Sequence, residues 1–289
     1  MVSIQANAKI NLTLDILGTR PDGYHEVAMV MQETGLCDMV NLEMRDKGIE
    51  LTLDRADLPA DETNLAYRAA KLFLESQKLA NGVAIDIQKR IPIAAGLAGG
   101  STDAAAVLLG MNKLFEAGLS ENELCVLGEK LGSDVPFCIC GGTMLASGRG
   151  EVLTRLPAMP ECYIVLAKPK VSVSTAWAYK TYDEQGADRH PDNKAIIAAL
   201  KDRNLKDICK NLGNVLEDVT RRAHSEIDEY KKIMLQNGAM AAMMSGSGPT
   251  VFALTESAET ASKIASAMRQ RADIEAVHIV KSVNTDNEN

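Results

Sequence analysis

The stretch that decides the fold reads Lys89-Arg-Ile-Pro-Ile-Ala-Ala-Gly-Leu-Ala-Gly-Gly-Ser-Thr-Asp-Ala-Ala-Ala-Val-Leu108. Residues 83–89 alternate apolar and polar side chains, which predicts a half-buried strand. Residues 103–115 carry Ala and Leu at helical spacing, which predicts a helix. Between the two lie glycines and hydroxyls at Gly96, Gly99, Gly100, Ser101 and Thr102. Glycines let the backbone turn and expose its N–H groups at a helix N-terminus, so this stretch predicts a site for an anion such as phosphate.

The common phosphate-loop motifs do not describe this stretch. A Walker A loop ends in Gly-Lys-Ser/Thr, and no Lys follows Gly99-Gly100. A dinucleotide fingerprint needs G-x-G-x-x-G, and the His-Arg-Asp and Asp-Phe-Gly motifs of protein kinases do not occur in the chain. A tight strand-to-helix turn with Ser101 or Thr102 as N-cap explains the glycines equally well. The loop by itself leaves both interpretations open.

Composition narrows the class of protein. The 289 residues are 46% hydrophobic, enough for the core of one large domain or two ordinary ones. The net charge of −8 argues against nucleic-acid or membrane-surface partners and leaves a small-molecule substrate as the expected partner. The six cysteines form no zinc pattern, and the N-terminus is not a signal peptide. We therefore expect a cytoplasmic protein with reduced thiols, either a monomer or a weak homodimer.

Residues 3–16 alternate so regularly that they predict a strand with one apolar and one polar face. The polar face offers Lys9 and Asn11. A solvated strand face is the simpler explanation. The functional alternative places an ammonium and an amide in a cleft, where they could bind phosphate and hydroxyl groups.

Four further positions carry two interpretations each. Tyr24 and His25 follow the Pro21-Asp22-Gly23 turn, where they are either structural or placed to stack on a nucleobase. Asn64 precedes a predicted helix at residues 65–78 and could be its N-cap. Asp134 stands before Val135-Pro136, where an ordinary turn carboxylate is expected.

Five segments in order along nearly the whole chain carry a resemblance to the superfamily of galactokinase, homoserine kinase, mevalonate kinase and phosphomevalonate kinase. They are Lys9-x-Asn11, Asp22-Gly23-Tyr24-His25, Pro92 to Ala105, Ser133-Asp134-Val135-Pro136, and Ser245-Gly-Ser-Gly-Pro249. The first two are similar to one branch, the 4-diphosphocytidyl-2-C-methyl-D-erythritol kinases. Ala98 departs from the pattern, since members often carry Gly or Ser there. Because Ala resists positive φ, we expect any left-handed turn at Gly96, Gly99 or Gly100.

The resemblance implies an α+β fold of two domains: residues 1–155 as an ATP-binding, ribosomal-protein-S5-like domain and residues 156–289 as a ferredoxin-like, substrate-side domain. It places the active site in the cleft between them. It implies transfer of the γ-phosphoryl of ATP to the C2 hydroxyl of 4-diphosphocytidyl-2-C-methyl-D-erythritol, a step of non-mevalonate isoprenoid synthesis.

The same resemblance implies roles for individual residues. Asp134 is the catalytic base and Lys9 the catalytic ammonium. The residues implied to bind ATP are Asn64, Pro92, Ile93, Ala94, Ala95, Gly96, Leu97, Ala98, Gly99, Gly100, Ser101 and Thr102. The residues implied to bind the substrate are Asn11, Tyr24, His25, Thr175 and Tyr179, although Trp177 and Tyr179 could instead be ordinary core residues. Mg²⁺ is expected with ATP. No carboxylate identifies itself as a protein ligand, while Ser101 or Thr102 could contribute a hydroxyl.

Two other functions stay open on sequence alone. A sister kinase could act on a mevalonate- or homoserine-type alcohol, and Tyr24-His25 is the feature that distinguishes it. A non-catalytic nucleotide-binding regulator could keep the fold, although the presence of both Lys9 and Asp134 speaks against it.

Overall fold

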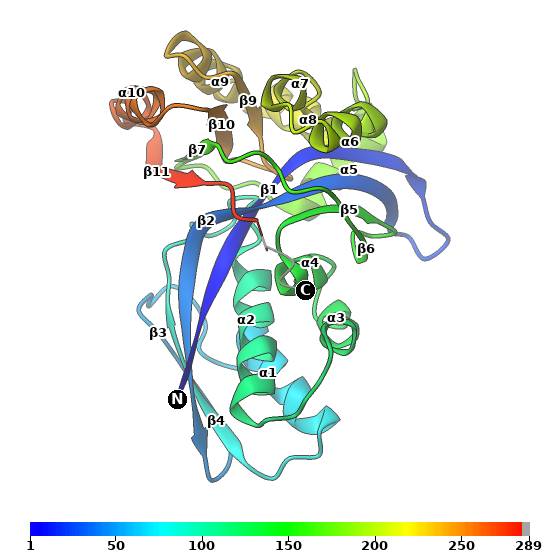
Figure 1. The fold of residues 1–289 in the computed structure, drawn as a ribbon, viewed down its shortest axis with the longest axis vertical. Helices are drawn as coiled ribbons and strands as arrows, with labels where there is room; N and C mark the ends of the chain where they lie inside the picture. The colour runs from blue at the N-terminus through cyan, green and yellow to red at the C-terminus, as the bar shows by residue number, and fades with distance from the viewer. Residues whose placement is uncertain (285–289) are drawn as a thin grey trace. The chain divides into compact units, whose positions relative to one another are not determined.

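The computed structural model describes residues 1–284, and its backbone forms two compact units. Unit 1 comprises residues 1–8, 36–91 and 98–140. Unit 2 comprises residues 9–35, 92–97 and 141 onward. The strands β1 (Val2–Thr19) and β2 (His25–Arg45) each contribute residues to both units (Figure 1). The domain boundary predicted at residue 155 stays a prediction.

In unit 1 the strand order is β3-β4-β2-β1, where β3 is Ile49–Leu53 and β4 is Gly82–Gln88. β4 runs antiparallel to β2, with Met39 opposite Gln88, and parallel to β3. β4 matches the strand predicted from its alternation. Its Val83, Ile85 and Ile87 are buried while Asp86 and Gln88 are exposed. A strand with one buried face is therefore what the period-two pattern produces here.

Four helices of unit 1 complete its core: α1 (Leu65–Ser76), α2 (Gly99–Leu114), α3 (Glu121–Glu129) and α4 (Val135–Cys140). α2 packs against α1 and α4 (Figure 1) and is buried along most of its length. Gly110 permits the close approach of α2 to the sheet, because a Cβ there would overlap Leu42 and lie 3.2 Å from Ile4. The capping box predicted at Ser120 and Glu123 is confirmed.

In unit 2, β1 pairs with the short parallel strand β8 (Gly213–Asn214), and β2 pairs with β5 (Thr143–Ser147). β5 forms the predicted hairpin with β6 (Val152–Arg155). A separate sheet has the order β11-β7-β10-β9. Its strands are β7 (Tyr163–Pro169), β9 (Ala241–Met244), β10 (Val251–Thr255) and β11 (Ile274–Lys281). All neighbouring strands in this sheet are antiparallel.

Helices α9 (Glu226–Gln236) and α10 (Ala258–Arg269) contact the strands of this second sheet (Figure 1). The other helices of unit 2 are α5 (Thr175–Gln185), α6 (Asn193–Lys201), α7 (Leu205–Lys210) and α8 (Val215–Ala223). The sequence of residues 205–218 predicts a single helix, and the structure contradicts this prediction. Asn204 caps α7, Asn214 caps α8, and Gly213 and Asn214 between them pair with β1. The two asparagine N-caps divide the apolar repeat between two helices.

The helix predicted at residues 103–115 begins earlier than expected. α2 starts at Gly99, so Gly99, Gly100, Ser101 and Thr102 form its first turn and are not a loop before it. Neither Ser101 nor Thr102 is its N-cap. The N-cap is Ala98, in the left-handed conformation at φ 61° and without a side-chain cap. The expectation that Ala98 would avoid positive φ is therefore wrong: Gly96 is left-handed as expected (φ 74°), but Gly99 and Gly100 are not.

Candidate functional site

The polar face of β1 is exposed at Ser3 and Gln5 but buried from Lys9 to Asp15, so the prediction of a solvated face is wrong for the part that holds Lys9 and Asn11. Lys9 is 5% exposed, Asn11 0% and Asp15 7%. Lys9 Nζ donates to Asn11 Oδ1 at 2.6 Å, and Asn11 Nδ2 lies 3.4 Å from Met29 Sδ. Burial of an ammonium is costly unless it has partners, and here a neighbouring amide supplies one. Over residues 9–15 the alternation of β1 therefore marks two buried faces, one of them polar.

The glycine-rich turn at Ser245–Pro249 lies beside residues 92–97 within unit 2. Ser245 Oγ donates to the carbonyl of Gly96 at 2.9 Å, and the amide of Lys9 donates to the carbonyl of Leu97 at 3.2 Å. A Cβ on Gly96 would overlap the Ser245 carbonyl oxygen and lie 3.1 Å from the Gly248 amide nitrogen. A Cβ on Gly246 would lie 3.5 Å from Asn11 Oδ1. These contacts bring Lys9, Asn11 and the first half of the predicted ATP loop together.

Thr175 joins the same neighbourhood. It is the first residue of α5, and its hydroxyl lies 3.0 Å from Ser247 Oγ. The Ser247 carbonyl accepts from Thr220 Oγ1 at 3.3 Å, while Asn214 Nδ2 donates to Gly246 O at 2.8 Å. Side chains of α8 and its N-cap thus hold the turn in place. Ser247 was not predicted as a site residue, although it stands in the quoted turn.

The aromatic residues predicted to bind a base also meet in unit 2. The rings of His25 and Tyr179 lie 4.9 Å apart at 34°. Tyr24 is 56% exposed, and the guanidinium of Arg149 lies 5.2 Å from its ring centroid. Trp177 is 37% exposed, so the alternative that it anchors the core is wrong. The arrangement pairs the His25 imidazole with the partly exposed Tyr179 ring, while the exposed Tyr24 ring contacts Arg149.

Asp183 is a partner that the sequence did not single out. Its Oδ1 lies 2.7 Å from His25 Nε2. The acidic oxygen accepts, so the ring donates through Nε2. Asp183 lies four residues after Tyr179 on α5, which places both on one helix face. The spacing could have suggested this pair once Tyr179 was chosen. The contact with His25 could not have been found that way, because it joins residues far apart in sequence.

In unit 1 the N-terminus of α2 fits an anion. The first intrahelical bond is from the Thr102 amide to the Ala98 carbonyl at 2.9 Å. The amides of Gly99, Gly100 and Ser101 therefore have no acceptor within the helix. Ala98 gives no side-chain cap, and Gly100 is exposed. Such a helix end presents its N–H groups and the positive end of its dipole, so the residues fit the phosphates of ATP.

Two neighbouring residues are committed to backbone contacts. The Thr102 hydroxyl donates to the Asn7 carbonyl at 2.6 Å and the residue is 1% exposed, which favours Ser101 as the accessible hydroxyl. Asn64 is the N-cap of α1: its Oδ1 accepts from the Ala66 amide at 2.9 Å, while its Nδ2 donates to the Pro59 carbonyl at 2.8 Å. The N-cap interpretation of Asn64 is thus confirmed, and its predicted contact with ATP stays a prediction.

Asp134 immediately precedes α4, and its carbonyl accepts from the Cys138 amide at 3.1 Å. The residue is partly exposed. The predicted site residues divide between the units. Unit 1 holds Asn64, Ala98, Gly99, Gly100, Ser101, Thr102 and Asp134; unit 2 holds Lys9, Asn11, Pro92, Ile93, Ala94, Ala95, Gly96, Leu97, Tyr24, His25, Thr175 and Tyr179.

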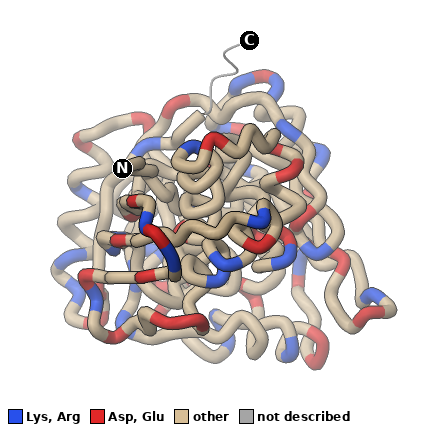
Figure 2. The backbone as a smooth tube through the Cα atoms, turned by 90° about the horizontal axis from the view of Figure 1, so that it is seen from below, with Lys and Arg blue, Asp and Glu red and all other residues tan. Residues whose placement is uncertain are grey.

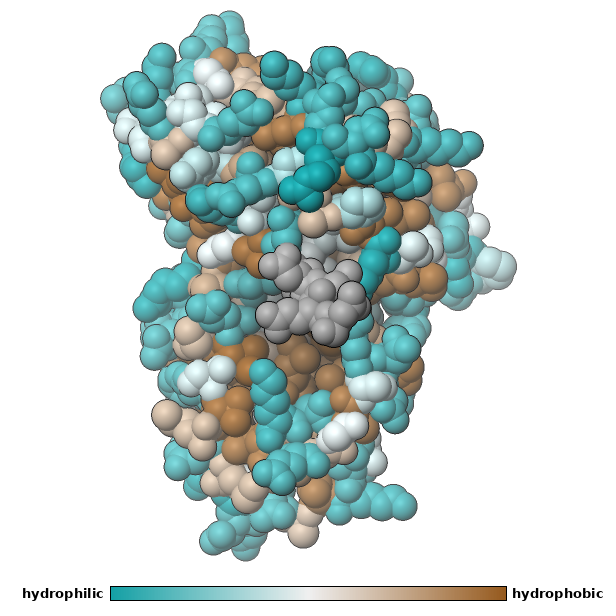
Figure 3. Space-filling model, viewed as in Figure 1, coloured by the Kyte–Doolittle hydropathy of each residue, from teal (hydrophilic) through white to brown (hydrophobic). Residues whose placement is uncertain are grey.

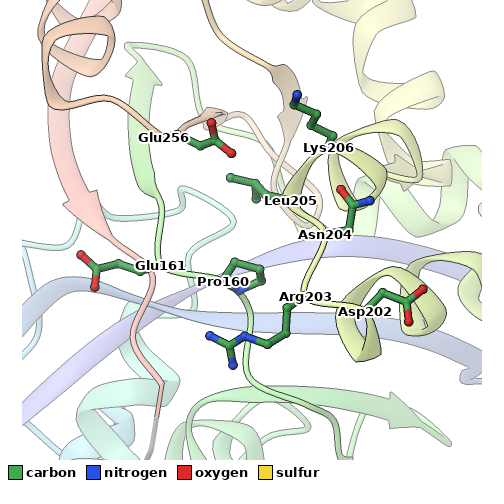
Figure 4. A pocket seen from close by; sticks show the side chains of 8 residues that line it. All are labelled: Pro160, Glu161, Asp202, Arg203, Asn204, Leu205, Lys206 and Glu256. Carbon is green, nitrogen blue, oxygen red and sulfur yellow. The ribbon is translucent and has the colours of Figure 1, made fainter.

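Another part of unit 2 carries a hollow of about 370 Å³ (Figure 4). It is lined by Pro160, Glu161, Asp202, Arg203, Asn204, Leu205, Lys206 and Glu256. Carboxylates and cations are mixed along its wall, and no residue of the predicted site lines it. Within residues 1–284, no three His, Cys, Asp or Glu side chains group as a metal centre.

Comparison with known proteins shows that this chain is similar to one superfamily of kinases. The model of the GHMP kinases N terminal domain matches residues 64–142, and that of the GHMP kinases C terminal matches residues 196–274. A 4-diphosphocytidyl-2-C-methyl-D-erythritol kinase of Acetivibrio thermocellus is 48% identical, covering 90% of this chain and 92% of the relative. One of Geobacillus kaustophilus is 50% identical over 88% of each chain.

Among solved structures, the crystal structure of a 4-(cytidine 5′-diphospho)-2C-methyl-D-erythritol kinase superposes with a TM-score of 0.84 at 33% identity. The superposition covers 98% of this chain and 100% of the other. These matches extend across both units. The α+β fold is that of the GHMP kinases, and the chain belongs to the family of 4-diphosphocytidyl-2-C-methyl-D-erythritol kinases within them.

Proposed function

We propose that this chain is an ATP-dependent kinase that phosphorylates the C2 hydroxyl of 4-diphosphocytidyl-2-C-methyl-D-erythritol. The products are the 2-phosphate and ADP, and the reaction is a step of non-mevalonate isoprenoid biosynthesis. The observation that supports the substrate assignment is the ring contact between His25 and Tyr179 in unit 2, with the exposed Tyr24 next to His25 in the chain. Rings of this kind stack on a nucleobase, and an imidazole with a fixed tautomer can read a base edge. Cytidine is the part of the substrate that such a cluster suits.

ATP binding is supported by the N-terminus of α2. The amides of Gly99, Gly100 and Ser101 would donate to phosphate oxygens, and the helix dipole would favour their charge. Residues 92–97 and Asn64 complete the proposed nucleotide contacts. Phosphoryl transfer needs positioning and charge neutralisation more than covalent chemistry, which suits a site built from main-chain amides.

Lys9 and Asp134 are the proposed catalytic residues. Asp134 would accept the proton of the attacking hydroxyl, which makes the oxygen a better nucleophile as the bond to phosphorus forms. The ammonium of Lys9 would stabilise negative charge on the transferring phosphoryl group. Asn11 holds Lys9 Nζ by the 2.6 Å hydrogen bond, so Asn11 orients the ammonium and would also contact the substrate.

Mg²⁺ belongs to the proposal as a companion of ATP. When bound, it neutralises charge on the phosphate oxygens. Ser101 offers a hydroxyl at the helix end, and Asp134 is a partly exposed carboxylate. The cytoplasmic location of the protein stays a prediction.

The direct test is a coupled ADP-release assay with the cytidine substrate and with mevalonate. We expect release with the first and none with the second. Asp134→Asn should lower turnover by about 10²–10⁴-fold, because the base is removed. ATP affinity should change little in that variant. Lys9→Ala should also lower turnover, since the ammonium is replaced by a methyl group.

Asp86→Asn is the matched control for Asp134→Asn, because Asp86 is an exposed carboxylate of unit 1 on β4. It should keep full turnover. Full turnover in both Asp134→Asn and Lys9→Ala would refute the catalytic assignment. If cytidine nucleotides fail to compete with the substrate, a sister kinase with another alcohol is the better description. If no alcohol supports ADP release while ATP still binds, the chain is a nucleotide-binding regulator.

A further inference from the structure

A buried ion cluster in unit 1 has no part in the function described so far. Lys89 is 8% exposed, Asp38 0% and Asp103 5%. Lys89 Nζ lies 2.5 Å from Asp38 Oδ2 and 2.6 Å from Asp103 Oδ2. Burying such charges is costly, and a buried ion pair is a weak source of stability compared with apolar packing. The cluster therefore calls for an explanation other than stability.

The cluster connects the two ends of the proposed ATP loop. Asp38 Oδ1 accepts from the amides of Arg90 and Ile91, the latter at 2.8 Å, immediately before Pro92. Asp103 directly follows Thr102 in α2. Lys89 bonds to both carboxylates and so joins the chain entering the loop to the helix that leaves it. A loop whose ends are tied in this way has fewer conformations to lose when a ligand orders it.

The first turn of α2 rests on the same cluster. A Cβ on Gly99 would lie 3.1 Å from Ile91 Cγ2 and 3.7 Å from Lys89 Nζ. The amides that would face phosphate belong to Gly99 and its two successors. Their position therefore depends on where Lys89 holds the end of β4 against the helix.

The cluster contains more carboxyl groups than ammonium groups. Two carboxylates surround one ammonium, and Asp103 Oδ1 is buried without a hydrogen-bond partner. Deleting the Asp103 carboxylate would leave Lys89 and Asp38 as a neutral pair. That deletion removes the link between Lys89 and α2 without leaving a buried charge unpaired, so the two effects can be told apart.

We propose that Lys89, held between Asp38 and Asp103, is a positioning residue that fixes the phosphate-binding end of α2 relative to the strand entering the loop. The proposal rests on the proposed ATP site and adds to it a set of side chains that act without touching the nucleotide. It predicts that removing the Lys89–Asp103 ion pair weakens ATP binding even in variants that keep the fold.

The test measures ATP affinity by calorimetry, KM for ATP and for the cytidine substrate, and the thermal midpoint. Asp103→Ala is the principal variant, because Ala is the best helix former and the remaining pair is neutral. We expect its thermal midpoint to be kept or raised, its ATP affinity to fall on the order of tenfold, and its KM for the cytidine substrate to stay within about twofold.

Lys89→Met is the second variant and Lys168→Met its control. Lys168 is 2% exposed in β7 of unit 2 and pairs with Glu275 at 2.9 Å, so both changes remove a buried, paired ammonium. Lys89→Met should lower ATP affinity and Lys168→Met should not, whatever each does to the thermal midpoint. Unchanged ATP affinity in Asp103→Ala would overturn the proposal. Equal losses of ATP affinity in the two lysine variants would also overturn it, in favour of general destabilisation.

This result is separable from the proposed function, because calorimetry with ATP needs no acceptor alcohol. Wild-type protein that binds ATP but phosphorylates neither alcohol would refute the proposed substrate. The effect of Lys89 and Asp103 on ATP affinity could still be measured in that case. Wild-type protein that does not bind ATP would refute both.

Discussion

Tyr24 shows how a single exposed side chain can serve binding without serving stability. The residue is 56% exposed, and its ring contacts the guanidinium of Arg149. A ring held this loosely contributes little to the core. In the proposed function it would stack on cytosine together with Tyr179.

We predict that Tyr24→Ala raises KM for the cytidine substrate by about 5- to 150-fold, the equivalent of the roughly 1–3 kcal/mol that base stacking contributes. KM for ATP and the thermal midpoint should stay nearly unchanged. Tyr163→Ala is the control, because Tyr163 is another tyrosine of unit 2 whose ring lies beside a cation, Lys281, although it is more buried than Tyr24. Equal effects in the two variants would contradict a role for Tyr24 in base binding.

Asp103 supplies a prediction about pH. Burial raises the pKa of Asp103 to about 7, and the nearby Lys89 only partly opposes this while Asp38 adds to it. The unfolded carboxyl titrates near 4. Between these values the native state binds the extra proton, so this group's contribution to stability falls as pH rises from about 4 to about 7.

Asp103→Asn removes that titration and keeps the shape of the side chain. We therefore expect the thermal midpoint of wild type, relative to the variant, to decline from pH 5 to pH 7.5. Thermal scans of both proteins across this range measure the difference and cancel contributions from other groups. A difference that stays constant, or that grows with pH, would be inconsistent with a buried, proton-binding Asp103.

At the scale of elements, the strand-to-helix connection from β4 to α2 contains three residues with positive φ, the first being Ala94 at 49°. Gly96 has φ 74° and touches the Ser245–Gly248 turn, whereas Ala98 has φ 61° at the helix N-cap. An alanine tolerates left-handed backbone at a cost, so the surrounding contacts must impose it.

We predict that Gly96→Ala destabilises the protein and lowers ATP affinity, since the new Cβ would overlap the Ser245 carbonyl oxygen and displace the turn. Gly48→Ala is the matched control. Gly48 also has positive φ, at 78°, but nothing lies within 4 Å of a Cβ there. The control should carry only the backbone strain and leave ATP affinity unchanged. If Gly48→Ala weakens ATP binding as much, contact with Ser245 is not the cause.

At the scale of the whole molecule, positive and negative residues are mixed along the part of the chain that the structure describes (Figure 2). On the face in Figure 3, hydrophilic residues predominate and hydrophobic ones occur in smaller groups among them. Large exposed hydrophobic residues such as Leu17, Val126 and Leu235 come from different elements. No helix within residues 1–284 is both long and apolar enough to cross a bilayer.

Scattered apolar residues of this kind are normal on monomers. We therefore predict that sedimentation velocity finds a species near 31.1 kDa at micromolar concentration, with at most weak self-association as concentration rises. A dimer that persists on dilution would contradict this prediction.

The sequence by itself determined the family and most of the elements, although not the break between α7 and α8 or the start of α2. The alternation of β4, the capping box of α3 and five motifs in order identified the fold, because local periodicity and turn chemistry act over a few residues. Tertiary structure alone decided the rest. The burial of Lys9 and Asn11, the left-handed Ala98, the Asp183–His25 pair and the Lys89 cluster depend on contacts between segments distant in sequence. A local sequence pattern does not specify which distant residue will lie in contact with a given side chain, since only packing of the whole chain fixes the distance between the two.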